Sequence, residues 1–360
     1  MGLRVIKPDT NINFIGIRKL AFILSASLIL IGLVSLISKG GPRYGIDFSG
    51  GVIVQLKFDQ GAELDALKDT LEQTNLPGLV VQRFGMDAEN EFLVRTSADK
   101  ISPEQIRDQV RTELSTRLPD KEFEIQRLEM VGPKVGADLR SNAMEALFFA
   151  VLLIAIYISG RFEQRWMTSA VMAGGLAIGV YFLKIMHAPM GFLIVAAMLI
   201  TLGLCWYLKL NYAFGAIIAL IHDVLITLGL FSLLNKQFDL SIVAAFLTII
   251  GYSLNDTIIV FDRIRENLRA KVSKSLEKTI NKSINQTLSR TLLTSGTTLL
   301  VVLCLFLFGG GVIHDFAFAL LVGILVGTYS SIYVASPILL GFRPGEEEED
   351  GGEKEGSLPA

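Results

Sequence analysis

The chain has 360 residues, of which 51% are hydrophobic and only 19% are charged, with a formal net charge of −2. Soluble proteins carry about 25% charged residues, and a net charge near zero gives no sign of a nucleic-acid partner. The cysteines, Cys205 and Cys304, stand in separate apolar runs and are expected to be small core residues. His187, His222 and His314 stand singly, so no metal site is indicated.

Charge is distributed unevenly along the chain. Residues 38–140 are rich in charge, whereas 142–260 and 291–341 carry very little. This segregation predicts a membrane protein with one water-facing domain. Stretches long and apolar enough to cross a bilayer lie at about 20–37, 142–159, 167–185, 190–208, 213–234, 240–261, 291–309 and 316–341, which predicts eight spans.

The first span, which follows a short tail at 1–19, is expected to remain in the mature protein as an anchor. Arg18 and Lys19 precede it, no A-x-A cleavage site follows it, and a folded domain comes next.

The domain at 38–140 shows alternating strand patterns and amphipathic helix patterns. Ser102-Pro-Glu-Gln105 has the form of a helix start, with a serine cap and a proline at the first helical position. The predicted order is a strand at 51–58, a helix at 61–74, strands at 79–84 and 91–96, a helix at 102–118 and a strand at 122–130. This βαββαβ order predicts a ferredoxin-like domain. No catalytic constellation stands out in it, so a binding or conformational role is favoured over chemistry.

The positively charged loops predict the orientation of the chain. Lysine and arginine are concentrated in the N-terminal tail, after the second span and in the basic segment 262–290. This basic segment is expected to be a cytoplasmic loop. Its start is expected to continue the preceding span as an amphipathic helix. Both termini are therefore expected to be cytoplasmic, and the domain to be periplasmic in a bacterium. The acidic, glycine-rich tail at 342–360 is expected to be disordered.

Asp256 lies inside the span predicted at 240–261, close to Ser253, Asn255 and Thr257. A charge in the hydrocarbon costs at least about 2.5–3.5 kcal/mol, so an ionisable residue there indicates function. Asp256 could carry a proton, because a carboxyl group exchanges one. It could instead make a structural hydrogen bond or ion pair between spans.

Two further polar sites lie near that depth. Arg290 begins the span at 291–309, on a polar edge that includes Ser295, and is the cation best placed to pair with Asp256; it could equally extend to lipid headgroups. His222 and Asp223 lie mid-span, where they could exchange protons or lock two helices together.

Several blocks of sequence resemble the SecD/SecF protein-export family. They are Gly45–Gly51 (GIDFSGG), Val131–Gly136 (VGPKVG), Ile221–Val224 (IHDV), Gly251–Ile258 (GYSLNDTI), Phe261–Asn267 (FDRIREN) and Ser289–Gly296 (SRTLLTSG). The first two are shared across the family, and the others are similar to its SecF branch. The residues that match the family motifs are Gly45, Asp47, Gly50, Gly51, Gly132, Pro133, Gly251, Asp262 and Arg263.

The resemblance implies half of an RND-type transporter bundle, with six core spans and a periplasmic domain after the first. It implies an accessory subunit, not an enzyme and without a cofactor, that pairs with SecD, works with the SecYEG channel and often YajC, contacts lipids, and uses the proton-motive force to promote preprotein translocation and release. By matching position, Asp256 would be the proton-carrying carboxylate and Arg290 its partner. Asn255, Asp223 and His222 complete the expected proton pathway.

The chain departs from the family pattern at one place. In the family, the motif that matches Arg161-Phe-Glu163 leads almost directly into the one that matches Gly215–Ile218. Here the stretch 166–212 intervenes and is predicted to add two spans as a peripheral hairpin. An even number of added spans preserves the orientation of everything that follows.

Two alternative functions stay open at this point. One is an RND-type subunit for small-molecule efflux, for which a single outer domain of about 100 residues is small. The other is a scaffold for SecD and the channel that carries no protons.

Overall fold

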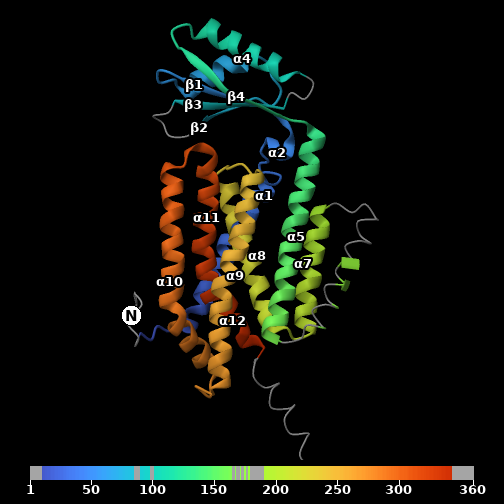
Figure 1. The fold of residues 1–360 in the computed structure, drawn as a ribbon, viewed down its shortest axis with the longest axis vertical. Coiled ribbons are helices and arrows are strands. Elements are labelled where there is room, and N and C mark those ends of the chain that lie inside the picture. Colours follow the sequence, from blue (N-terminus) through green and yellow to red (C-terminus); the bar gives the residue numbers. More distant parts are fainter. Residues whose placement is uncertain are drawn as a thin grey trace, which may run out of the picture.

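The computed structural model describes residues 10–84, 90–97, 101–163 and 190–342, together with residues 167, 171, 174–175 and 177–178. Long helices run side by side in a bundle, and a sheet covered by helices stands beyond one end of it (Figure 1). The acidic tail predicted at 342–360, except residue 342, and most of the span predicted at 167–185 lie outside the described residues.

Six helical segments in the described part of the chain are long and apolar enough to cross a membrane. They coincide with six of the eight predicted spans. The helices are α1 (Arg18–Ser38), α5 (Pro133–Glu163), α8 (Asn211–Leu233), α9 (Leu240–Arg269), α10 (Leu276–Phe308) and α11 (Gly310–Ser330), the last continued by the π-helical turn η3 (Ser331–Ala335), α12 (Ser336–Ile338) and the short turn η4 (Leu339–Gly341). The span predicted at 190–208 corresponds to α7 (Met190–Tyr207), whose stretch Met198–Tyr207 is apolar but shorter than the other six.

The basic segment 262–290, predicted to connect two spans, is largely helical. α9 continues to Arg269, as the amphipathic pattern at its start predicted, and α10 begins at Leu276. The segment packs through an apolar face: Ile280 and Ile284 are buried in the bundle core, and Asn267 donates a hydrogen bond to Ser283 across the two helices at 2.8 Å.

The outer domain has the predicted element order, and the helix that contains the second predicted span begins at Pro133. Its elements are β1 (Gly51–Phe58), α3 (Leu64–Glu72), β2 (Val80–Phe84), β3 (Glu91–Thr96), α4 (Pro103–Arg117) and β4 (Phe123–Val131). The strand order is β2-β3-β1-β4, and every neighbouring pair is antiparallel. Ser102 and Gln105 form the capping box that the sequence indicated at the start of α4.

The two faces of the sheet have different surroundings. Val52, Val54 and Leu56 point to one face and are fully buried with the apolar sides of α3 and α4. Ile53 and Gln55 alternate with them and point to the other face, toward the membrane bundle.

Both connections between the domain and the bundle pass through one tight junction. Gly50 (φ 74°) follows α2 (Ile46–Ser49), and a Cβ there would lie 2.8 Å from the Cα of Pro133, the first residue of α5. Gly51 (φ 130°) would place a Cβ 2.5 Å from the carbonyl oxygen of Thr96. The paired glycines are therefore required by backbone conformation and space.

α1 crosses α8 at two facing glycines. A Cβ added at Gly32 would lie 2.7 Å from the Cα of Gly229, and the reverse distance is the same. This contact lets the backbones approach closely, as small residues do between membrane helices. It holds α1 against the helix that carries His222 and Asp223.

Gly229→Ala is expected to lower the thermal unfolding midpoint of the purified protein in detergent, because overpacking costs about 1–3 kcal/mol. Gly296→Ala is the matched control, since a Cβ at this helical glycine meets no atom within 4 Å. The control should keep or raise the midpoint, because alanine has the higher helix propensity. Equal midpoints for the two variants would contradict the close crossing.

Candidate functional site

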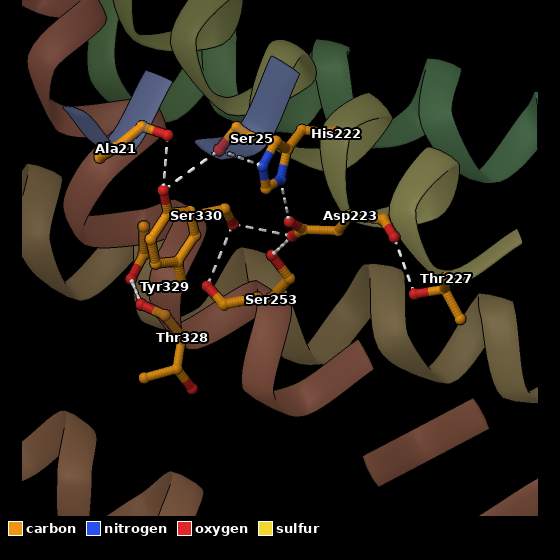
Figure 2. A network of polar contacts seen from close by, with 11 residues as sticks. Ala21, Ser25, His222, Asp223, Thr227, Ser253, Thr328, Tyr329 and Ser330 are labelled. Carbon is orange, nitrogen blue, oxygen red and sulfur yellow. Dashed lines mark hydrogen bonds and ion pairs between the residues drawn. The ribbon is translucent and has the colours of Figure 1, made fainter. Parts of the chain in front are cut away.

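The carboxylate of Asp223 is fully buried among four helices of the bundle (Figure 2). Its Oδ2 accepts hydrogen bonds from the hydroxyl of Ser253 on α9 at 2.5 Å and from that of Ser330 on α11 at 2.8 Å. Its Oδ1 lies 2.9 Å from Nδ1 of His222. In hydrocarbon, where water cannot supply partners, these bonds make a buried carboxylate tolerable.

His222 extends the network to α1. Its Nε2 lies 2.9 Å from the hydroxyl of Ser25, which donates to the hydroxyl oxygen of Tyr329 at 3.2 Å. Tyr329 in turn donates to the carbonyl oxygen of Ala21 at 2.8 Å. The rings of His222 and Tyr329 also stack, with centroids 6.0 Å apart.

Both ring nitrogens of His222 have polar partners. Nε2 faces the hydroxyl of Ser25, and Nδ1 faces Oδ1 of Asp223. Which nitrogen donates depends on the tautomer of the imidazole. The pair joins α8 to α1 through Ser25, to α9 through Ser253 and to α11 through Ser330.

Asp256 lies one turn beyond Ser253 on α9 and is also buried. Its Oδ2 accepts a hydrogen bond from Ser295 on α10 at 3.0 Å, and Ser295 accepts one from Thr328 on α11 at 2.9 Å. Its Oδ1 is buried and has no hydrogen-bond partner among the residues that the structure describes. That oxygen is the atom on which an added proton would remove the cost of a buried charge.

Arg290 is not joined to Asp256 by a hydrogen bond or an ion pair within the described part of the chain. Its side chain is exposed, although its charge is close enough to act on the Asp256 carboxylate. Asn255 is exposed on another face of α9, and no described hydrogen bond links it to either carboxylate. Of the five residues predicted for a proton pathway, three are buried in the two networks: His222, Asp223 and Asp256.

One segment of α11 serves both carboxylates. Thr328 connects to Asp256 through Ser295, and Ser330, two residues later, binds Asp223 directly. The π-helical turn η3 begins immediately after Ser330. π-helical turns within α-helices occur frequently at functional sites.

Sequence reasoning missed Ser25, Thr328, Tyr329 and Ser330. Hydroxyl side chains in apolar helices usually donate to carbonyls of their own helix, as Thr297 does here. The consecutive polar residues Thr328, Tyr329 and Ser330 near the middle of the last span were the available signal, but such a run does not identify the helices that the side chains face.

The residues of the predicted motifs have structural contacts. Asp262 forms an ion pair with Arg161 at 2.7 Å and joins α9 to α5, and Arg263 donates to Gln286 of α10 at 2.7 Å. At the other end of α9, Asp47 accepts a hydrogen bond from the backbone of Leu240 at 3.1 Å. The remaining motif positions are Gly45, packed on Asp239, and Gly132 and Gly251, at which a Cβ would meet no atom within 4 Å.

Comparison with known proteins places this arrangement in a family. The model described as "Protein export membrane protein SecD/SecF, C-terminal" matches residues 111–205 and 183–344, and that of the "SecD/SecF GG Motif" matches residues 35–62. The chain is 41% identical over 340 residues to the "Protein translocase subunit SecF" of Calditerrivibrio nitroreducens, covering 94% of this chain and 96% of the relative. It is 37% identical over 338 residues to the protein of that name in Vibrio alginolyticus, covering 94% and 91%.

A solved structure is also similar. The crystal structure of SecDF from Thermus thermophilus, described as a translocon-associated membrane protein, superposes with a TM-score of 0.67 at 32% identity. The match covers 92% of this chain but only 39% of that one, so the chain spans well under half of the SecDF polypeptide.

Ser330→Ala is expected to lower the free energy of unfolding in detergent by about 1–3 kcal/mol, because a buried carboxylate loses one of its donors. Thr297→Ala is the control, since its exposed hydroxyl donates only to carbonyls of its own helix; a change within about 0.5 kcal/mol is expected. If Ser330→Ala has the same free energy of unfolding as Thr297→Ala, the hydrogen bond from Ser330 to Asp223 contributes nothing to stability.

Proposed function

The chain belongs to the SecD/SecF family of protein-export membrane proteins, as a SecF-type translocase subunit, and from this premise we propose how it works. It uses the proton-motive force, together with SecD, to promote translocation and release of preproteins across the inner membrane. Protons pass through the buried groups of the bundle, and their binding alters the packing of helices that reach the outer domain.

The unsatisfied buried oxygen of Asp256 is the observation that carries the proton proposal. An ionised carboxylate at this position has one hydroxyl donor and no direct cation partner among the described residues. Protonation would remove the free-energy cost of its buried charge. Approach of the Arg290 guanidinium would favour the ionised form again. Such alternation between two environments is what a proton carrier requires.

His222 and Asp223 form a second proton site in this proposal. Its two side chains lie within hydrogen-bond distance of each other, and Ser253, which donates to Asp223, is one turn from Asp256 on the same helix. Asp223 on α8 accepts from Ser253 of α9 and Ser330 of α11, while Asp256 on α9 accepts from Ser295 of α10, which Thr328 of α11 contacts. Proton binding at either carboxylate would therefore change contacts in which α9 and α11 both take part, and these two helices would couple the networks.

We propose that SecD binds the side of the bundle where α1 and α10 lie. Only 28% and 17% of the apolar windows of these two spans are buried inside the protein, against 56% for the spans that begin at Asn211 and Leu240. The matched SecDF chain is more than twice as long, which leaves room for a SecD-like half. We propose contacts with SecYEG, YajC and the preprotein on the ground of the same family membership.

The topology that we propose has eight crossings, both termini in the cytoplasm and a ferredoxin-like domain in the periplasm. The positive charge of the short loops and the β2-β3-β1-β4 strand order support it. The two matches to the C-terminal family model overlap at 183–205, inside the stretch 166–212, as expected if an added hairpin interrupts the family pattern.

Asp256→Asn is expected to abolish the contribution of the proton-motive force to export and to remove proton flux through the reconstituted complex, because an amide cannot exchange a proton at this position. The measurements are preprotein translocation into inverted vesicles and pH change inside proteoliposomes. Asp69→Asn, at an exposed position on α3, is the control and should behave as the parent. If both variants export and conduct normally, the subunit is a scaffold that carries no protons.

Co-purification is expected to recover a SecD-like protein with the full-length chain and, equally, with a chain that lacks 166–212, if the hairpin is peripheral. The yield of the complex per mole of tagged chain is the quantity to compare. Loss of the complex only in the shortened chain would assign the hairpin to the SecD interface.

A further inference from the structure

A cavity of about 730 Å³ separates the uncovered face of the outer sheet from the outer end of the bundle. On the sheet it is lined by Ile53, Gln55, Gln82, Leu93 and Arg95, among others. On the bundle it is lined by the loop between α8 and α9, by the start of α9 and by the junction of α10 and α11. The sheet therefore does not rest directly on these helices.

Arg95 extends into this cavity from β3, in the middle of the sheet. It alternates with the fully buried Val94, so it lies on the face toward the bundle. Its Nε is buried without a hydrogen-bond partner in the part of the chain that the structure describes. Burial lowers the pKa of the Arg95 guanidinium, while the charges of Asp239, Asp315 and Asp47 act to raise it.

Gln237 lies on the opposite wall and is complementary to Arg95. Its Oε1, an acceptor, is likewise buried with no partner among the described residues, while its Nε2 donates a long 3.4 Å hydrogen bond to Gln82 on β2. The unpaired Nε of Arg95 on the sheet thus faces a cavity whose other wall holds the unpaired Oε1 of Gln237 and several carboxylates. Each unpaired buried group costs free energy that closure would recover.

The acidic residues on that wall belong to the helices of the proton networks. Asp239 caps α9 by accepting a hydrogen bond from the backbone of Ile242 at 3.1 Å, and Asp315 lies in the first turns of α11. α9 carries Asp256, and α11 carries Ser330. A contact with Arg95 would therefore act on the outer ends of α9, which carries Asp256, and of α11, which carries the Ser330 donor to Asp223.

The domain is attached where it could pivot. Its two connections to the bundle meet at Gly50 and Pro133, below one side of the sheet, whereas α10 and α11 end below the other side (Figure 1). A small rotation about the junction would change the width of the cavity without breaking a strand pairing.

We propose that this cavity is the open gap of an electrostatic latch, in which Arg95 closes onto Gln237 and Asp239 and brings the outer domain down on the ends of α9 and α11. Arginine suits this role because its planar guanidinium donates several hydrogen bonds at fixed angles and keeps its charge. The latch is a conformational contact of this chain and does not depend on the route that protons take.

The test is a distance measurement by pulsed electron spin resonance on the full-length chain in lipid nanodiscs. Cys205 and Cys304 are first replaced by alanine, and spin labels are attached at the exposed positions Asp69 on α3 and Leu234 at the outer end of α8. In the parent protein, the distances between the two labels should fall into a longer, open population and a shorter, closed population. Gln237→Glu should increase the shorter-distance fraction at least twofold, because a carboxylate replaces the amide acceptor.

Arg95→Gln should remove the shorter-distance population, and the double variant Arg95→Gln with Gln237→Glu should match Arg95→Gln alone. Arg111→Gln, at an exposed position on α4, is the charge-matched control and should resemble the parent. The latch is overturned if Gln237→Glu leaves the distances unchanged, or if it shifts them equally with and without Arg95. Gln237→Glu alone decides the question if Arg95→Gln does not fold.

Discussion

The contact between His222 and Asp223 is the interaction on which the bundle depends, because it places an ionisable pair where water cannot solvate it. Every atom of the pair that can form a hydrogen bond meets a residue of another helix or the other member of the pair. The resulting network joins α1, α8, α9 and α11. A change in its protonation therefore changes contacts between helices, which is how a local charge can alter the packing of a membrane bundle.

The second carboxylate differs from the first in being incompletely satisfied. Asp223 has partners on both oxygens, whereas Asp256 has a buried oxygen with none among the described residues. Structural polar groups in hydrocarbon are normally paired, so this unpaired oxygen is the basis for the proposal that Asp256 exchanges a proton. Thr328 and Ser330 lie two residues apart on α11, directly before its π-helical turn, and connect that helix to both sites.

Much of this arrangement could be predicted from the sequence, and the exceptions have physical causes. The free-energy cost of placing a charge in hydrocarbon was enough to single out Asp256, His222 and Asp223, because ionisable groups are rare in apolar spans. Period-two and helical patterns identified the elements of the outer domain within a few residues. The pairing of Asp256 with Arg290 was not found, because depth along a helix does not specify which face a side chain occupies. Ser25 and Tyr329 were missed because a hydroxyl in an apolar span gives no sign of whether it bonds its own helix or another.

The central claim, that buried carboxyl groups of the bundle bind and release protons, can be tested by infrared spectroscopy of the reconstituted protein over a range of pH. The carbonyl stretch of a protonated carboxyl group lies apart from the bands of ionised carboxylates. The account predicts such a band near neutral pH that decreases as the pH rises, and that loses one component in Asp256→Asn. A spectrum in which all carboxyl groups are ionised near neutral pH, with no band that responds to this substitution, would contradict the account.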